Sequence, residues 1–349
     1  MDAIFLQVLN MSLTASYVIL VVSIIRQLLK KAPKIFSYAL WSAVLFRLIC
    51  PFSIESFFSL ISMNPNPIPV NILYARIPQI STGINFIDSI ANSVFATPKA
   101  VPYASFNPIQ LFILLGEFIW VVGFSIWLVY SILSLLRLRS KLVGAVKLRD
   151  NIYLADHIAT PFVIGVLHPK IYLPSTLSEQ EQKYIILHEQ THVLRYDHII
   201  KIIAFLALVI HWFNPLVWLA FILCTKDMEM SCDESVMKQI DTDIRKEYSA
   251  SLLSLATGKK IISGAPLAFG GGDTKARIKN VMNYKKTKTW IAAVSMVLVV
   301  LFCVGFTTNP VNNDSGKNSL GNEKTNITVN ISVQISESLD RAVSLAIKA

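Results

Sequence analysis

Long apolar runs constrain the fold of this chain more than any other feature of its sequence. Three of them, at about residues 4–25, 109–136 and 289–306, are each long enough to cross a bilayer as a helix. A fourth run, about 35–51, is short, but its aromatic residues and Arg47 suit a place at the membrane interface. Only 15% of the residues are charged, against roughly 25% in soluble domains. We therefore expect a mainly α-helical protein with four transmembrane spans.

Basic residues predict how these spans are oriented. Lysine and arginine gather in three segments, 26–34, 137–149 and 275–288, each next to an expected span. Because such residues favour the cytoplasmic side, both termini should lie outside. The loop before the third span has only Arg76 and Lys99, so it should also lie outside. The net charge of +10 is then explained by topology and by attraction to anionic lipid, and no nucleic-acid contact is expected.

The expected organisation follows from these boundaries. The parts are two spans in 1–52, an extracellular loop in 53–108, a third span in 109–136, a cytoplasmic domain in 137–288, a fourth span in 289–306 and an extracellular tail in 307–349. Within the tail, residues 325–335 alternate apolar and polar side chains as a β-strand does. Such a strand would pair with the 53–108 loop or with another protein, and a disordered tail is the alternative.

The motif His188-Glu189-Gln190-Thr191-His192 lies in a predicted helix, about 177–195, which Ser178 and Glu181 would open as a capping box. Histidines four residues apart project from one face of a helix, where both rings can bind one metal ion. The carboxylate between them then lies beside the metal-bound water. This pattern is typical of zinc hydrolases. The alternative is a surface helix that carries two histidines by chance.

A catalytic zinc ion needs about three protein ligands, so the third must come from another segment. Glu229 and Asp233, in the helix-compatible run 227–234, share one helix face. We expect Glu229 to be the third ligand and Asp233 to accept a hydrogen bond from the free ring N–H of a ligand histidine. Cys232 is expected at the wrong angle to join them. The alternative is an ordinary solvated acidic helix.

The apolar run 199–224 lies between the two halves of this expected site. If the run crossed the bilayer, Glu229 would be left about 30 Å from the histidines. Pro215 also interrupts a helix in the middle of the run. We therefore expect a hairpin of two short helices that dips into the inner leaflet, or lies against it, and returns Glu229 to the metal. His211 in this hairpin is expected to be a packed or interfacial residue.

Several motifs, taken in order, resemble those of a known family. They are TPFVIG at 160–165, PKIYLP at 169–174, HEQTH at 188–192, YDH at 196–198, WFNPLVW at 212–218 and EMSCDE at 229–234. This series resembles the bacterial antirepressor membrane zinc metallopeptidases of the BlaR/MecR type, over about residues 4–306. The resemblance implies a gluzincin-type zinc peptidase domain on the cytoplasmic side. It also implies an unidentified extracellular ligand and, as protein substrate, a cytoplasmic transcriptional repressor.

One part of that family's pattern is missing from this sequence. Members that sense β-lactams carry a penicillin-binding domain with a Ser-x-x-Lys nucleophile after their last span. Residues 307–349 contain no Ser-x-x-Lys. β-Lactam sensing is therefore not expected, and a homodimer is left open.

The expected chemistry is hydrolysis of a peptide bond with one Zn²⁺ ion as the cofactor. Glu189 would take a proton from the zinc-bound water and deliver it to the leaving amine. An oxyanion donor is also expected, and the candidates are His198, Arg245 and Tyr248. Residues 151–155 and 171–173 read as short strands. In the resembling family such a strand lies beside the cleft and pairs with extended substrate.

The segment 263–272 is a loop by composition, with Pro266 and three consecutive glycines. In the resembling family this region can be cut by the enzyme itself, and Ala268 and Phe269 mark the candidate site here. A flexible linker that is never cut is the alternative.

Three functions stay open from the sequence. The first is a signalling peptidase that cuts a repressor, the second a zinc protease for membrane protein quality control, and the third a non-catalytic receptor or scaffold. Arg47 and Glu117, the isolated charges within apolar runs, should either pair across helices or each face interface water.

Overall fold

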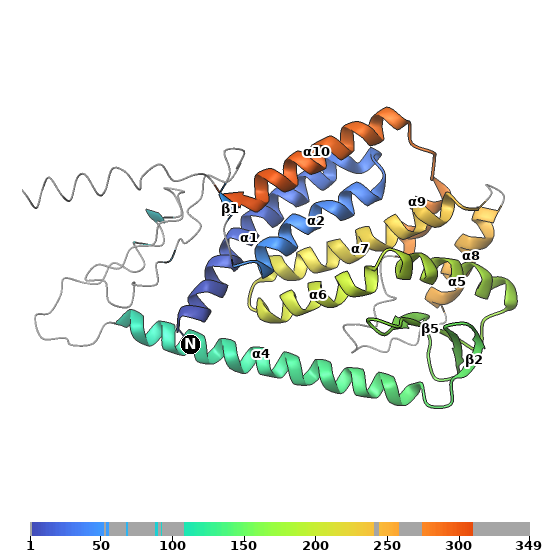
Figure 1. The fold of residues 1–349 in the computed structure, drawn as a ribbon, viewed down its shortest axis with the longest axis horizontal. Helices are drawn as coiled ribbons and strands as arrows, with labels where there is room; N and C mark the ends of the chain where they lie inside the picture. Colours follow the sequence, from blue (N-terminus) through green and yellow to red (C-terminus); the bar gives the residue numbers. More distant parts are fainter. Residues whose placement is uncertain are drawn as a thin grey trace, which may run out of the picture.

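The computed structural model describes residues 2–51, 108–240, 244–257 and 274–309, together with 54–55, 68, 88, 89 and 92. Its helices are α1 Asp2–Leu28, η1 Leu29–Lys31, α2 Lys34–Ile49, α4 Pro108–Lys141, α5 Glu179–Leu194, α6 Asp197–Ile210, α7 Pro215–Met237, α8 Arg245–Thr257, α9 Thr274–Met282 and α10 Thr289–Thr307. Its strands are β1 Ile54–Glu55, β2 Val146–Arg149, β3 Ile152–Ala155, β4 Phe162–Ile164, β5 Lys170–Pro174 and β6 Thr308–Asn309. The prediction of a mainly α-helical protein with a few short strands is confirmed (Figure 1).

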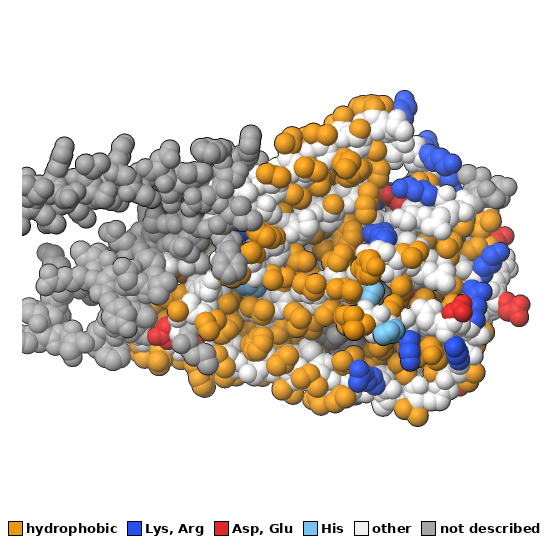
Figure 2. Space-filling model, in the orientation of Figure 1, with side chains coloured by type: hydrophobic (Ala, Val, Ile, Leu, Met, Phe, Trp, Pro, Cys, Tyr) orange, Lys and Arg blue, Asp and Glu red, His pale blue; other side chains and the backbone are white. Residues whose placement is uncertain are grey.

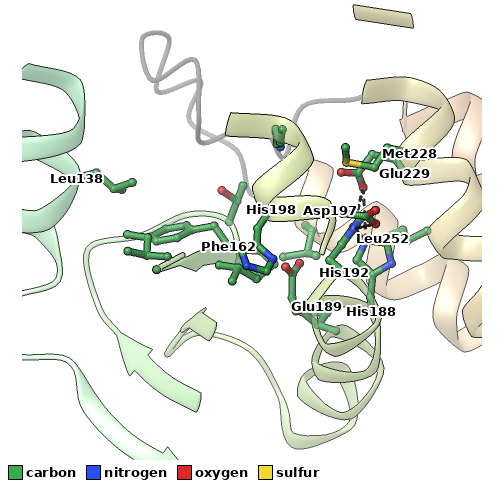
Figure 3. Close-up of a pocket in the computed structure, with 18 of the residues that line it drawn as sticks. Leu138, Phe162, His188, Glu189, His192, Asp197, His198, Met228, Glu229 and Leu252 are labelled. Carbon is green, nitrogen blue, oxygen red and sulfur yellow. Dashed lines mark hydrogen bonds and ion pairs between the residues drawn. The ribbon is translucent and has the colours of Figure 1, made fainter. Parts of the chain in front are cut away.

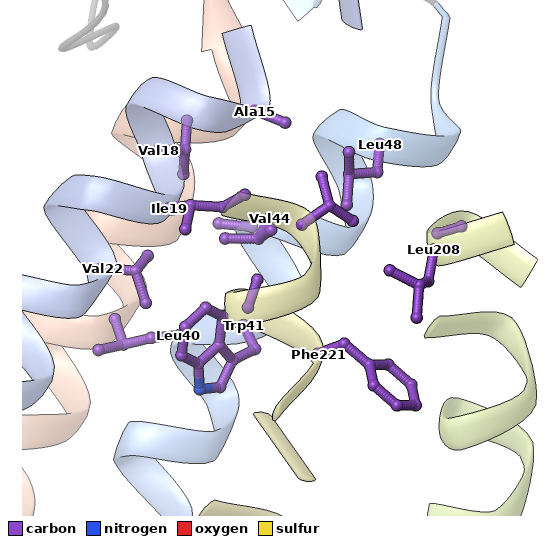
Figure 4. Close-up of a cluster of buried hydrophobic side chains, with 14 of the residues drawn as sticks. Ala15, Val18, Ile19, Val22, Leu40, Trp41, Val44, Leu48, Leu208 and Phe221 are labelled. Atoms are coloured by element: carbon purple, nitrogen blue, oxygen red, sulfur yellow. The ribbon is translucent and has the colours of Figure 1, made fainter. Parts of the chain in front are cut away.

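Helices α1, α2, α6, α7 and α10 bury one apolar core between them. On α2, Trp41 and Leu48 lie among side chains from three other helices, including Val22 of α1, Leu208 of α6 and Phe221 of α7 (Figure 4). This core holds α7 against α2 over much of its length, so α2 is positioned to influence whatever α7 carries.

Within the described residues, three helices, α1, α4 and α10, are long and apolar enough to cross a membrane. The predicted second span is α2, but α2 has only 16 residues, fewer than the roughly 20 that a spanning helix needs. The count of four spans therefore stays a prediction. Apolar side chains cover much of the visible surface, whereas Lys and Arg gather at the end that holds the sheet, α5 and α9 (Figure 2).

Helix α4 packs against the edge of the main core through Phe124 and Trp127, and none of the side chains in its most apolar window is fully buried. It touches the turn between α6 and α7 through aromatic residues. The indole N–H of Trp120 donates to the carbonyl of Ile210 at 2.8 Å. A Cβ atom at Gly123 would lie 2.2 Å from the ring of Trp212, so only glycine allows this close approach.

The chain reverses direction between α6 and α7. Asn214 caps α7 by accepting a hydrogen bond from the amide of Leu216 at 2.9 Å, and Pro215 begins the helix. The Asn214 side chain also donates to the hydroxyls of Ser12 and Ser16 on α1, at 2.8 and 2.7 Å. The reversal agrees with the hairpin expected from the sequence. Its relation to a bilayer stays a prediction.

A four-stranded sheet precedes the motif helix α5. Its strand order is β2-β3-β5-β4, with β3 and β5 parallel and the other two pairs antiparallel. Ile152 on β3 and Ile171 and Leu173 on β5 pack under Ile185 and Ile186 of α5. This contact fixes α5 on the sheet, and β4 is left as one edge of the sheet among the described strands. The strand expected at 325–335 lies outside the described residues.

Arg47 and Glu117 do not pair with each other. Arg47 donates to the carbonyls of Phe306 and Thr308, at 2.8 and 2.9 Å, at the end of α10. Glu117 instead lies beside Asp2. The cross-helix pair is therefore wrong, because the unpaired carbonyls at a helix C-terminus offer the guanidinium nearer acceptors.

Candidate metal centre and active site

Helix α5 presents the two histidines of the HEQTH motif on one buried face. Its start is fixed by the predicted capping box, in which Ser178 and Glu181 each hydrogen-bond the other's backbone. The Nε2 atoms of His188 and His192 lie 3.1 Å apart, and the rings meet edge to face. Both side chains are largely shielded from solvent. Two nitrogen donors are thus directed at one point.

Glu229, on α7, brings a carboxylate to the same point. Its Oε2 atom lies 3.4 Å from Nε2 of His188 and 3.8 Å from Nε2 of His192. Donors bound to a tetrahedral zinc ion lie about 3.4 Å from one another, because each is about 2.1 Å from the metal. The spacing of the three atoms is therefore compatible with shared ligation of one metal ion (Figure 3).

Cys232 also reaches this group, contrary to the sequence expectation. Its Sγ and one ring nitrogen each of His188 and His192 all lie within 4.8 Å of one another. The expectation was wrong because residues three apart on a helix lie on nearly the same face, so Cys232 follows Glu229 toward the centre. Glu229 and Cys232 are therefore two candidates for the third donor beside the two imidazoles.

Asp233 lies behind His188, where the sequence predicted a supporting acceptor. Its Oδ1 is 3.3 Å from Nδ1 of His188. Tyr248 of α8 joins the pair: its hydroxyl donates to Oδ1 of Asp233 at 2.7 Å and lies 3.0 Å from Nδ1 of His188. The Tyr248 hydroxyl therefore faces the rear of His188 rather than the metal-facing Nε2 side.

Asp197 supports His192 in the same way, and the sequence interpretation did not assign it this part. Its Oδ2 lies 2.8 Å from Nδ1 of His192. Tyr196, in the left-handed region at φ 59°, turns the chain sharply between α5 and α6 and places Asp197 at the first position of α6. The sequence feature that could have revealed this role is an acidic residue five positions after the second histidine.

Arg277, on α9, was also missed. It donates to Asp233 through two nitrogens, at 2.8 and 2.7 Å, and its Nη1 lies 3.0 Å from Oε2 of Glu229. Its Nη2 lies 3.2 Å from Nε2 of His188. Nothing in the local sequence around 277 signals this contact, because it joins residues more than 40 positions apart.

The ionisable groups of the site change one another's pKa. Burial disfavours charge on His188, but Cys232 and Glu229 beside it outweigh burial and raise its pKa to about 10. Burial disfavours ionisation of Glu229, yet Arg277 and the two imidazoles lower its pKa well below the usual range. Without a metal, His188 therefore holds a proton and Glu229 is ionised, so a metal ion that binds here must displace the imidazole proton.

A cavity of about 420 Å³ opens in front of these donors. Glu189 and His198 both lie on its wall, close to Phe162 of β4 (Figure 3). Apolar side chains form most of the rest: Leu135 and Leu138 of α4, Val163 and Ile164 of β4, Ile185, Ile202, Met228, Leu252 and Leu255. The cavity could receive an extended peptide with apolar side chains next to the donor set.

The remaining predicted site residues lie elsewhere. Arg245 is not part of the cavity wall; it donates to the carbonyl of Tyr284 at 2.8 Å. His211 lies 3.0 Å from the carbonyl of Leu48 and is packed, as expected from the sequence. Ala268 and Phe269 lie outside the described residues.

Comparisons with known proteins agree with this geometry. Residues 6–281 match the family model described as BlaR1 peptidase M56. The regulatory protein BlaR1 of Bacillus licheniformis is 30% identical over 151 residues, which are 41% of this chain and 25% of that protein. The methicillin resistance mecR1 protein of Staphylococcus aureus is 29% identical over 138 residues, 37% of this chain and 24% of that protein.

The matches span about a quarter of the length of these two relatives. The family model, in contrast, covers well over half of this chain, including both helices that carry the donor set. The chain therefore belongs to the BlaR1 peptidase M56 family.

Proposed function

We propose that this protein is a membrane zinc endopeptidase in signal transduction. In this proposal His188, His192 and Glu229 hold the metal and Glu189 is the catalytic base. The observation that carries the proposal is the convergence of two imidazole nitrogens and one carboxylate oxygen, 3.1 to 3.8 Å apart, at the wall of a cavity. Membership of a peptidase family supports it.

Each side chain then has a defined task. A zinc ion bound there would supply a water of lowered pKa and polarise the scissile carbonyl. Glu189 takes the water proton and delivers it to the leaving amine. Asp197 accepts the Nδ1–H of His192, and the Tyr248 hydroxyl, which donates to Asp233, accepts the Nδ1–H of His188, so that each Nε2 lone pair is free to face the centre. His198 and Tyr248 both share the cavity wall with Glu189, but the Tyr248 hydroxyl is bonded to Asp233 behind His188, so His198 is the best placed of the three oxyanion candidates.

Strand β4 is the surface that we propose for the substrate backbone. Phe162, Val163 and Ile164 pair with β5 along one side, and the same residues line the cavity. An extended peptide added at this edge would gain main-chain hydrogen bonds while its apolar side chains enter the cavity. The basic end of the molecule holds this edge, which supports an active site on the cytoplasmic side.

We further propose that the substrate is a cytoplasmic transcriptional repressor, cut after an extracellular stimulus. The proposal is supported by the similarity to a regulatory protein and to a methicillin resistance protein. Self-cleavage at Ala268 and Phe269 would use the same chemistry. It is tested by comparing chain lengths in wild type and Glu189→Gln after stimulation, where identical lengths would remove it.

The test of the peptidase proposal is a comparison of two glutamates on one helix. Glu189→Gln should lower peptide hydrolysis by about 10²- to 10⁴-fold, the usual contribution of a general base, while zinc stays bound. Glu179→Gln, an exposed change in the first turn of α5, should leave hydrolysis unchanged. Equal activity of the two variants would contradict the proposal. Protein captured by the Glu189→Gln variant in cells would separate one repressor from many misfolded substrates.

A further inference from the structure

One face of α2 bonds to three carboxylates of the region that carries the metal centre. The backbone N–H of Lys34 donates to Glu234 at 2.8 Å, and the indole N–H of Trp41 donates to Asp227 at 2.9 Å. Between them, the hydroxyl of Tyr38 donates to Oδ1 of Asp197 at 3.1 Å. Tyr38 and Trp41 project from one helix face because they are three residues apart, and the N–H of Lys34 belongs to the first turn of the same helix.

Only one of these three carboxylates touches a metal-binding histidine. Oδ1 of Asp197 accepts from Tyr38, and Oδ2 of the same group lies 2.8 Å from Nδ1 of His192. Asp197 is 1% exposed, so water does not compete freely for either oxygen. Arg195 lies against both partners, with Nε 3.4 Å from Oδ2 of Asp197 and its guanidinium 5.4 Å from the centre of the Tyr38 ring.

We propose that Tyr38 is a positioning residue for the metal centre and acts on His192 through Asp197. A carboxylate that accepts an imidazole N–H fixes the tautomer and the orientation of the ring. The second bond, from Tyr38, fixes the carboxylate in turn. Without it Asp197 is held only through its other oxygen, by His192 and Arg195, and the direction of the His192 ring is less firmly fixed. The inference rests on the proposed function only in taking His192 as a metal ligand.

The consequence is a physical link between the membrane part of the molecule and its metal centre. Tyr38 lies on α2, whose far end contacts α10 through Arg47 and the carbonyl of Phe306. A shift of α2 relative to α6 would break the 3.1 Å bond to Asp197 before it disturbed the donor atoms themselves. A signal that moves α2 would in this way change the affinity of the centre for its metal.

The test compares Tyr38→Phe with two controls in the full chain. Trp41→Phe removes a neighbouring bond from α2 to a carboxylate but leaves Asp197 alone. Tyr17→Phe removes a hydroxyl from a ring that packs on Phe306, away from the donor set. The readouts are the zinc dissociation constant, from competition with a chelator, and the absorption spectrum of the Co²⁺ form. Neither readout needs peptide cleavage.

Tyr38→Phe should weaken zinc binding by about 3- to 10-fold, less than the 10- to 100-fold loss typical when a direct partner of a ligand is removed. The Co²⁺ spectrum should change, whereas both controls should keep the affinity and the spectrum of wild type. Unchanged zinc and Co²⁺ binding in Tyr38→Phe would overturn the proposal. So would an equal loss in Trp41→Phe, since α2 would then act by packing alone. Wild type that binds no metal would overturn both this inference and the proposed function, whereas metal binding without peptidase activity would overturn only the latter.

Discussion

The two halves of helix α7 bury different kinds of side chain. From Pro215 to Cys224 the buried side chains are apolar, such as Val217 and Phe221 in the shared core. From Asp227 to Met237 the same helix buries four carboxylates, each with a donor from another part of the chain. The apolar half is stabilised by packing, whereas the polar half depends on partners that are distant in sequence. Function is concentrated where burial is most costly.

The largest expected effect concerns the third donor in the polar half. Glu229→Ala should abolish stoichiometric zinc binding, because two histidines alone leave the metal underligated. Cys232→Ser should retain one zinc per chain. Metal content of the purified variants measures both. Zinc retained in Glu229→Ala and lost in Cys232→Ser would exchange the roles of the two residues.

Whether a contact of the polar half of α7 can be predicted depends on how far apart its two residues lie in the sequence. The spacing of His188 and His192 and that of Glu229 and Asp233 is local, and the structure brings all four together. Arg277 contacts Asp233 across 44 positions, and Tyr38 contacts Asp197, the partner of His192, across 159 positions. No local pattern reveals such contacts, because packing sets them. Cys232 was misjudged although the needed information, its place three residues after Glu229, was local.

Prediction from the sequence has the same limit for the apolar helices α1, α4 and α10. Apolar length predicted α1, α4 and α10, and the requirement for a shared metal predicted the reversal at Asn214. The partners of Arg47 and Glu117 could not be predicted, because either charge could reach several helices once the spans were packed.

The next largest effect should come from replacing Arg277, the cation that bonds to the carboxylates of the polar half of α7. Arg277→Met leaves Asp233, whose side chain is 0% exposed, without its two charged hydrogen bonds. Breaking a buried pair in this way should lower the free energy of unfolding by about 3–5 kcal/mol. The exposed Lys275→Met on the same helix should change it by no more than about 0.5 kcal/mol. Denaturation in detergent measures both, and equal costs would contradict the ion-pair account.

A smaller effect is expected where α4 meets the apolar end of the hairpin. Gly123→Ala would place a Cβ 2.2 Å from the Trp212 ring, and such overpacking should cost about 1–3 kcal/mol in the free energy of unfolding. At Gly116, on the same helix, the nearest atom is the ring tip of Phe5 at 3.2 Å, which can move aside. Gly116→Ala should be neutral, or stabilising by up to about 1 kcal/mol, because alanine favours a helix. The reverse order of costs would mean that α4 does not dock at Trp212.

The pH dependence of zinc binding is the smallest effect when it is expressed per pH unit. The pKa of His188, raised to about 10, means that its imidazole holds a proton at neutral pH in the absence of metal. Zinc must displace that proton, so the apparent affinity should rise by up to about tenfold, or about 1.4 kcal/mol, per pH unit and displaced proton.

The metal-free protein should show the opposite trend. A raised histidine pKa stabilises the fold fully below its unfolded value of about 6.5, and this contribution is lost as the pH rises through about 10. Zinc titrations and melting curves between about pH 6 and pH 9 would show both slopes. His168→Gln, an exposed change, should leave them unaltered. Zinc affinity that does not vary over this range would show that His188 is already neutral before the metal binds.

The most direct test of the metal centre is zinc absorption-edge spectroscopy of the zinc-loaded full chain. Ligation by His188, His192 and Glu229 predicts two imidazole shells and only nitrogen or oxygen neighbours, at about 2.0–2.2 Å. A sulfur neighbour at about 2.3 Å would show that Cys232 binds the metal, and fewer than two imidazoles would contradict the site itself.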